Sequence, residues 1–280
     1  MYAILNGQMV LKSDLLVSPT DLGLQRGYAA FDFFRTKNFV PLFLPDYLDR
    51  FFTSAQAMHL ALPFEKPELR QQLETLIEKT GVPDLGVKLL LTGGYSADGF
   101  VPLKPNFMAI PEPLAAMPTV LAPAIRLMTH PFQREMPHLK TTNYLTAIWL
   151  LPRLQAYGAH DALYHQHGTV AECPRANIFM VNAKGELCTP ALQVLHGITR
   201  KKVLQLAAKH TTVVERPIAL DELLKAEEVF ITSTTKRLLP VATIDRCTIG
   251  TGKAGPLTTR LFADFVDLEN AACKNVSALA

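Results

Sequence analysis

The stretch PHLKTTNYLTAIWLLP, residues 137–152, places one lysine, Lys140, directly before a segment without charged side chains. A lysine taken by itself is most often a solvated surface cation. An amine beside apolar surface loses hydration, and this loss lowers the pKa of the ammonium group. A neutral amine can attack a carbonyl carbon and form a Schiff base, so the stretch makes Lys140 a candidate for covalent chemistry.

A lysine that forms a Schiff base with pyridoxal 5′-phosphate (PLP) needs a phosphate cradle, a carboxylate for the pyridine nitrogen and a wall for the ring. One candidate cradle is the sequence GIT at residues 197–199, because it opens a predicted helix whose first N–H groups can bind an anion. A second candidate is the hydroxyl run STT at residues 233–235, after a predicted strand. Both patterns also occur as ordinary caps and turns.

Two further residues suit the remaining parts of such a site. Arg50, in a predicted helix, can offer a bidentate guanidinium to a phosphate, although a solvated helix arginine has the same pattern. Glu172 stands at the end of a predicted strand next to Pro174, which is an unusual place for an exposed acid. An ionised carboxylate there would keep a pyridine nitrogen protonated and strengthen the electron sink.

Composition excludes several classes of protein. The chain has 280 residues, 49% of them hydrophobic, which is enough for a large interior and favours two domains. The net charge of +3, without a basic block interleaved with aromatics, argues against a nucleic-acid partner. We see neither an apolar run of membrane-spanning length nor a signal-peptide pattern, and we expect no membrane partner and a cytoplasmic location. The four cysteines lack CxxC spacing, so we expect free thiols and no metal site.

Local patterns predict an α+β fold in two unequal domains. Asn6-Gly7 predicts a β-hairpin, and apolar residues at helical spacing predict helices within residues 44–62 and 67–81. The first strand of the second half is predicted over residues 119–130, and Pro152 should break the helix that follows Lys140. We expect a small N-terminal α/β domain, a proline-rich linker and a larger cofactor-binding domain, at residues 1–112, 113–119 and 120–280.

Five stretches, taken in order, resemble the class IV (fold type IV) PLP-dependent aminotransferases: LQRGYAAFDFFRT (24–36), LKTTNYL (139–145), GTVAECPRANIFMV (168–181), LHGITR (195–200) and VFITSTTKRLLPV (229–241). This family includes branched-chain aminotransferases, D-amino-acid aminotransferases and aminodeoxychorismate lyases. The resemblance covers nearly the whole chain. It implies the fold type IV architecture, a small α/β domain plus a larger β-barrel-like domain, and a homodimer.

The resemblance also implies a role for each candidate. Lys140 would carry the cofactor and move a proton between the substrate α-carbon and the cofactor, while Glu172 would pair with the pyridine nitrogen. Asn177 would support the loop around Glu172, Leu195 would pack flat against the ring, and Tyr144 would bond the cofactor's 3′-oxygen. The phosphate would be held by a larger set: Arg50, Gly197, Ile198, Thr199, Ser233 and Thr234.

The chain departs from the family's pattern near the expected substrate. YAAFDFF, residues 28–34, replaces the common Gly-Asp-Gly-Val-Phe-Glu, so Tyr28, Phe31 and Phe33 either line an aromatic pocket or belong to the core. Arg175 either binds the substrate carboxylate or is a surface residue. Lys88 is a possible substitute for an arginine of the D-amino-acid branch, and Thr235 completes the candidate substrate set.

The resemblance implies a ping-pong transfer of an amino group between an amino acid and a 2-oxo acid. A branched-chain L-amino acid is the first choice, because the first long strand offers apolar walls, and a D-amino acid is the alternative. Aminodeoxychorismate lyase activity is less favoured, since Phe33 stands where the lyase branch usually has a small hydroxyl residue. A relative with a scaffolding role is the third possibility.

Overall fold

The computed structural model describes residues 1–277, which form two compact units. Unit 1 comprises Met1–Ala116, Leu139–Asn143 and the described residues from Ala271 on, and unit 2 comprises Met117–His138 and Tyr144–Asn270. The short segment around Lys140 therefore folds with unit 1, although the segments on both sides of it belong to unit 2. The division at residues 113–119 stays a prediction about independently folding domains.

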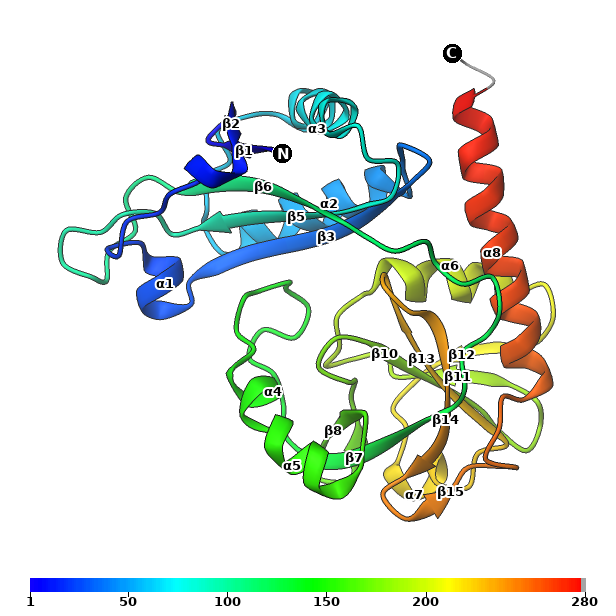
Figure 1. Ribbon diagram of the computed structural model, residues 1–280. Coiled ribbons are helices and arrows are strands. Elements are labelled where there is room, and N and C mark those ends of the chain that lie inside the picture. The colour runs from blue at the N-terminus through cyan, green and yellow to red at the C-terminus, as the bar shows by residue number, and fades with distance from the viewer. Residues whose placement is uncertain (278–280) are drawn as a thin grey trace. The chain divides into compact units, whose positions relative to one another are not determined.

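Unit 1 is built on a six-stranded antiparallel sheet in the order β2-β1-β6-β5-β3-β4 (Figure 1). The predicted hairpin is present, and Asn6 and Gly7 have φ values of 50° and 84°. Positive φ at both positions is what a type I′ turn requires, which explains the Asn-Gly pair. The strands span Tyr2–Leu5 (β1), Gln8–Leu11 (β2), Ala29–Lys37 (β3), Val40–Pro41 (β4), Leu85–Thr92 (β5) and Asn106–Pro113 (β6).

Two amphipathic helices pack on this sheet, α2 against β3 and α3 against β1. Both have proline in the first turn, where a missing N–H breaks no helical hydrogen bond. The helix predicted over residues 44–62 ends at Ala57, because His59 adopts a left-handed φ of 53°. The helices of this unit are Lys12–Asp14 (η1, a 3₁₀ turn), Leu22–Arg26 (α1), Leu44–Ala57 (α2) and Lys66–Thr80 (α3).

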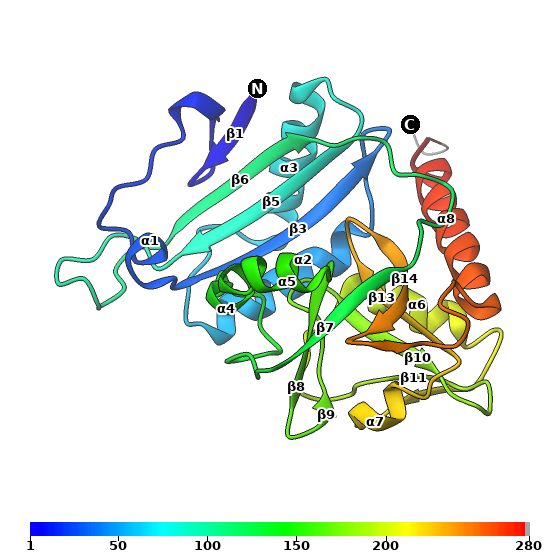
Figure 2. The same cartoon turned by 60° about the horizontal axis from the view of Figure 1, so that its bottom comes forward.

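Unit 2 contains a nine-stranded mixed sheet that curls around its hydrophobic core (Figures 1 and 2). Its path is β12-β11-β10-β13-β14-β7-β8-β9, and β15 pairs with β14. The strand predicted over residues 119–130 begins only at Ile125, after Pro123, which lacks the N–H that a ladder needs. The strands span Ile125–Pro131 (β7), Asp161–Gln166 (β8), Thr169–Val170 (β9), Asn177–Val181 (β10), Leu187–Thr189 (β11), Val213–Glu215 (β12), Glu228–Ser233 (β13), Arg237–Ile244 (β14) and Cys247–Thr248 (β15).

The predicted helix break near Pro152 is confirmed. One helix ends at Trp149 and the next begins at Leu151, with Pro152 in its first turn, where the ring is tolerated. The remaining helices are Leu145–Trp149 (α4), Leu151–Tyr157 (α5), Ile198–Ala207 (α6), Leu220–Leu223 (α7) and Pro256–Ser277 (α8).

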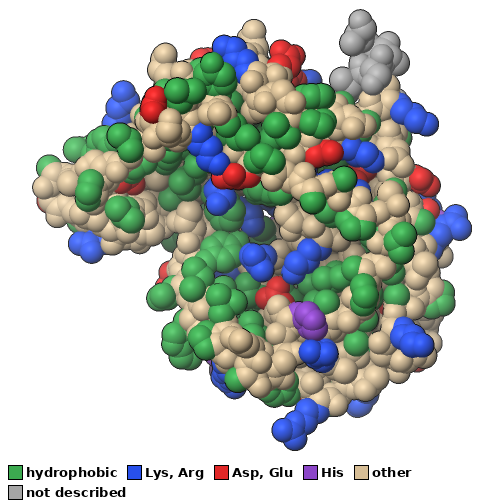
Figure 3. All heavy atoms as spheres, viewed as in Figure 1, with side chains coloured by type: hydrophobic (Ala, Val, Ile, Leu, Met, Phe, Trp, Pro, Cys, Tyr) green, Lys and Arg blue, Asp and Glu red, His purple; other side chains and the backbone are tan. Residues whose placement is uncertain are grey.

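Several expectations about the surface and the cysteines can be compared with the described residues. None of the four cysteines forms a disulfide, as predicted. Within residues 1–277 no helix has both the length and the apolar character needed to span a bilayer. The same residues contain no cluster of His, Cys, Asp and Glu side chains suited to a metal ion. The face drawn in Figure 3 carries charged side chains of both signs among apolar ones, in keeping with the small net charge.

Candidate active site

The segment around Lys140 is fixed to unit 1 by backbone hydrogen bonds to the start of β3. The Phe31 N–H donates to the Lys140 carbonyl at 2.9 Å, and the Thr142 N–H donates to the Ala29 carbonyl at 3.1 Å. Helix α2 contributes as well, because the Lys140 N–H donates to the Ser54 hydroxyl at 3.2 Å. A strand and a helix therefore both fix the backbone of Lys140. A residue that forms a covalent bond with a cofactor needs its position fixed in this way.

The side chain of Lys140 is half-buried and lies against aromatic surface. Its Nζ is 4.7 Å from the centre of the Phe31 ring. An ammonium group over a ring face gains a cation–π attraction, and the ring shields that side of the amine from water. The sequence predicted that the apolar residues after Lys140 would surround its amine. The apolar neighbour in the structure is instead Phe31, on β3.

Arg50, the candidate phosphate ligand on α2, forms a bidentate ion pair with Asp32 on β3. Its Nε donates to Oδ2 at 2.9 Å and its Nη2 donates to Oδ1 at 2.6 Å. The guanidinium also lies over the Tyr47 ring, 5.4 Å from its centre. Sequence reasoning missed Asp32, although an acid inside the apolar strand AAFDFF was a visible signal, because a buried carboxylate needs a partner.

The predicted substrate residues of unit 1 lie on or beside the same sheet. The Tyr28 hydroxyl donates to the Met58 carbonyl, at the end of α2. The Phe33 ring packs against Gly86 of β5. A Cβ at Gly86 would lie 2.4 Å from this ring, so only glycine leaves room for it. Lys88 is directly opposite Phe33 in the strand register and is exposed. Phe33 is half-buried, and its place in an aromatic pocket or in the core stays a prediction.

Glu172 is a buried carboxylate of unit 2 held by three donors. Arg134 Nη1 donates to its Oε1 at 2.7 Å, and the Asn177 side chain and the Leu195 N–H donate to its Oε2 at 3.2 and 3.0 Å. Charge-assisted bonds of this kind are what make an ionised carboxylate tolerable in the interior. Arg134 was missed by the sequence analysis, because nothing in its local pattern distinguishes it from a surface arginine.

Asn177 ties the loop around Glu172 to the start of α6. Its Nδ2 also donates to the Leu195 carbonyl at 2.7 Å, so one amide bridges two segments. Gly197 makes room for that amide, because a Cβ there would lie 2.2 Å from Asn177 Oδ1. The glycine is required by this close approach and not by its backbone conformation.

The start of α6 has the features of an anion site. Gly197 is the N-cap and supplies no side chain, and Ile198 and Thr199 form the first, buried turn. The first N–H groups and the helix dipole favour negative charge at this end. At the end of β13 the Ser233 hydroxyl is buried and finds no hydrogen-bond partner among the described residues. A buried hydroxyl without a partner is costly, so it marks a place where a ligand can supply one.

The other predicted residues of unit 2 differ in exposure. Leu195 is buried and Tyr144, the N-cap of α4, is half-buried. Thr234 is half-buried, whereas Thr235 is exposed. Arg175 is exposed at the tip of a tight turn that directly follows Glu172.

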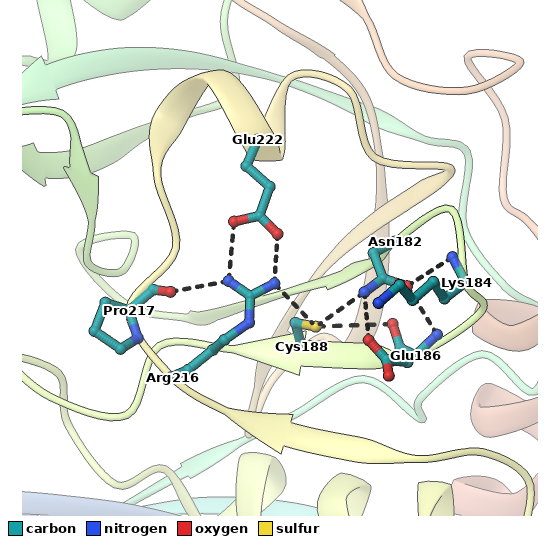
Figure 4. Close-up of polar contacts among 7 residues, drawn as sticks. All are labelled: Asn182, Lys184, Glu186, Cys188, Arg216, Pro217 and Glu222. Carbon is teal, nitrogen blue, oxygen red and sulfur yellow. Dashed lines mark hydrogen bonds and ion pairs between the residues drawn. The ribbon is translucent and has the colours of Figure 1, made fainter.

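A second polar cluster of unit 2 contains no predicted site residue (Figure 4). Both terminal nitrogens of Arg216 donate to the Glu222 carboxylate, and this pairing lowers the pKa of Glu222. Arg216 Nη2 also lies 3.7 Å from the Cys188 sulfur, but burial dominates and raises the pKa of that thiol. The cluster connects β11, the end of β12 and α7.

Comparisons with known proteins identify the family of the chain. A family model described as amino-transferase class IV matches residues 29–244. The chain belongs to the class IV aminotransferases. A D-alanine aminotransferase of Bacillus licheniformis is 31% identical over 268 residues, which cover 92% of this chain and 93% of the relative. A putative branched-chain-amino-acid aminotransferase of Methanocaldococcus jannaschii is 32% identical over 280 residues, which cover 96% of each chain.

Solved structures share the fold of this class IV aminotransferase. A branched-chain amino acid aminotransferase from Thermobaculum terrenum, in its PLP-form, is 23% identical with a TM-score of 0.88, covering 97% of this chain and 94% of that chain. The branched-chain amino acid aminotransferase from Escherichia coli is 24% identical with a TM-score of 0.87, covering 95% and 93%. The predicted fold type IV architecture is therefore confirmed.

Proposed function

We propose that this class IV aminotransferase uses PLP to move an amino group between a branched-chain L-amino acid and a 2-oxo acid, in a ping-pong reaction. The observation that carries the proposal is the placement of the Lys140 amine over the Phe31 ring, on a backbone held by β3 and α2. A solved branched-chain aminotransferase of the same fold holds pyridoxamine 5′-phosphate, and another structure of that enzyme holds a phosphopyridoxyl compound.

The described residues fit this cofactor. The start of α6, which has no side-chain capping hydrogen bond, and the unpartnered Ser233 hydroxyl suit a phosphate, and Thr199 and Thr234 would add hydroxyl donors. The buried Leu195 side chain offers an apolar wall for a ring, and the Tyr144 phenol would bond its 3′-oxygen. When bound, PLP supplies an aldehyde and a ring that takes up electrons.

The chain itself would contribute proton transfer and charge. Lys140 would hold the cofactor and, once released from it, act on the proton at the substrate α-carbon. Glu172, stabilised by Arg134 and two N–H donors, would keep the pyridine nitrogen protonated. Arg50, which also pairs with Asp32, would bind the phosphate through its guanidinium.

The choice of a branched-chain substrate rests on the apolar residues that share a face of β3 and β5. Phe31 lies opposite Leu90 in the strand register, next to the Lys140 amine, and such a surface suits an aliphatic side chain. Arg175 or Lys88, both exposed, would bind the substrate carboxylate. A D-amino acid is the second candidate, because the D-alanine aminotransferase of Bacillus licheniformis is as similar as the branched-chain relative. Lyase activity is the least favoured of these three reactions, since the Phe33 ring lies near this face.

Two experiments test the proposal. Borohydride reduction of the protein with PLP, followed by peptide mass spectrometry, should place a phosphopyridoxyl group on Lys140. Lys140→Ala should abolish this label and the visible absorbance band, whereas Lys184→Ala, at an exposed lysine, should change neither. Label on another lysine would overturn the assignment. A donor screen with L-leucine and D-alanine, each with 2-oxoglutarate, then decides the substrate, and pyruvate release from aminodeoxychorismate without an acceptor would favour the lyase.

We also propose that the chain works as a homodimer, as the family resemblance implies. Light scattering of the active enzyme should give twice the mass of the 31.0 kDa chain. Full activity at the monomeric mass would contradict this proposal.

A further inference from the structure

The cation proposed to hold the phosphate already has an anionic partner within unit 1. Asp32 and Arg50 meet edge to edge in two parallel hydrogen bonds, the strongest geometry available to this pair. The Asp32 carboxylate is fully buried, and the Arg50 side chain is 12% exposed. A pair so little exposed to water is weakly screened, so the carboxylate acts strongly on the field around the guanidinium.

The position of Asp32 is fixed by the sheet. Asp32 pairs with Leu89 across the β3–β5 ladder, and the Asp32 Oδ1 also accepts a hydrogen bond from the Phe33 N–H at 2.7 Å. Phe34, two residues on and therefore on the same face of β3, packs against Tyr47 of α2. The carboxylate is thus directed at α2 by the strand itself and cannot move away when a second anion approaches Arg50.

We infer that Asp32 is the resident counter-ion of Arg50. By pairing with Arg50, Asp32 stabilises the cofactor-free protein and lowers the affinity of Arg50 for a phosphate. The effect on phosphate affinity rests on the proposed function. Asp32 and Arg50 together carry no net charge, so the pair attracts an anion less than a lone guanidinium would. The guanidinium fork keeps its orientation, because Asp32 takes one edge and the Tyr47 ring lies against its face.

A substitution that removes the charge of Asp32 should separate these effects. Without the carboxylate, a nearly buried cation loses the ion pair that it forms with Asp32, and this loss destabilises the cofactor-free protein. A bound phosphate would then replace the lost charge, so binding energy and folding energy become linked. Asp32 is in this sense a positioning residue that sets how much the phosphate contributes to cofactor binding.

The experiment compares Asp32→Asn with Asp49→Asn in the cofactor-free protein. Asp49 is on α2, next to Arg50 in the sequence, and pairs with Lys66 at 2.6 Å. Both side chains of that pair are well exposed, so the control removes the same charge without breaking the Asp32–Arg50 pair. Equilibrium dialysis gives the Kd for PLP and for pyridoxal, which lacks the phosphate, and a melting curve is recorded with and without inorganic phosphate. These readouts do not depend on catalysis.

For Asp32→Asn we expect a lower melting temperature, a larger stabilisation by inorganic phosphate than in the unaltered protein, and a Kd for PLP lower by roughly tenfold. The Kd for pyridoxal should stay unchanged, and Asp49→Asn should change none of these quantities. An unchanged or higher Kd for PLP in the folded variant would overturn the inference. If the variant folds only when a ligand is present, folding that is restored by PLP but not by pyridoxal supports the inference. Folding that is restored by neither compound, or by both, overturns it.

Failure of the proposed function would look different. An unaltered protein that binds no PLP in dialysis would remove the proposed cofactor. The response of Asp32→Asn to inorganic phosphate would still decide whether Asp32 is the counter-ion that limits anion binding at Arg50.

Discussion

Arg134 Nη1 donates to Glu172 Oε1 at 2.7 Å, and their side chains are only 11% and 5% exposed. Arg134 comes from the loop after β7 and Glu172 from the loop before β10, so the bond joins two connections of the curled sheet. The same Nη1 also donates to the Pro137 carbonyl at 3.3 Å, close in sequence to Lys140. One arginine therefore orders both the buried acid and the segment that leads to the candidate covalent lysine.

Replacing Arg134 should destabilise the folded protein even when no cofactor is bound. Arg134→Met removes the ion pair between Arg134 and the buried Glu172 carboxylate, and we expect the free energy of unfolding to fall by about 3 kcal/mol. Urea denaturation of the cofactor-free protein measures it. Arg153→Met, at an exposed arginine of α5, should stay within about 0.5 kcal/mol of the unaltered protein. Arg134→Met combined with Glu172→Gln should be less destabilised than the sum of the two; strict additivity would show that the pair does not interact.

Gly197→Ala should disturb the Asn177 bridge. The new Cβ would lie 2.2 Å from Asn177 Oδ1, so the amide must move and its bonds to Glu172 and Leu195 weaken. We expect a loss of about 1–3 kcal/mol in the free energy of unfolding and weaker PLP binding. In an Asn177→Ala background the same glycine substitution should cost much less. An equal cost in both backgrounds would assign the effect to the helix start and not to the clash.

The stability of the fold should depend on pH through His130. Burial, followed by the nearby charges of Arg153 and His165, lowers the pKa of His130 from its ordinary 6.5. Below pH 6.5 His130 therefore binds a proton more readily in the unfolded chain than in the folded protein. The free energy of unfolding falls as the pH drops below 6.5. His130→Gln should flatten the dependence of the melting temperature on pH below 6.5. His138→Gln, at an exposed histidine, should leave the slope as it is.

Pro152→Ala distinguishes a helix break from a strained helix. Because Pro152 stands in the first turn of α5, no helical hydrogen bond is missing there. We expect a change below about 1 kcal/mol, in the destabilising direction, since alanine gives the unfolded chain more freedom. A stabilisation of about 3 kcal/mol in urea denaturation would mean that the proline interrupts an otherwise continuous helix.

Local chemistry determined several features of this protein. The Asn6-Gly7 hairpin and the break at Pro152 follow from backbone geometry within a few residues, so the sequence alone predicted them. The candidate residues Lys140, Glu172 and Arg50 were identified from their side-chain chemistry and their order along the chain. Their roles at the site stay proposals.

Only the tertiary structure decided which residues accompany these candidates. Phe31 lies under the Lys140 amine, Asp32 pairs with Arg50, and Arg134 pairs with Glu172. Each contact joins segments that are distant in the sequence, and each depends on strand register and helix packing that local patterns do not encode. The sequence determined which chemical groups are present, and the fold decided the charge and the apolar surface that each of them meets.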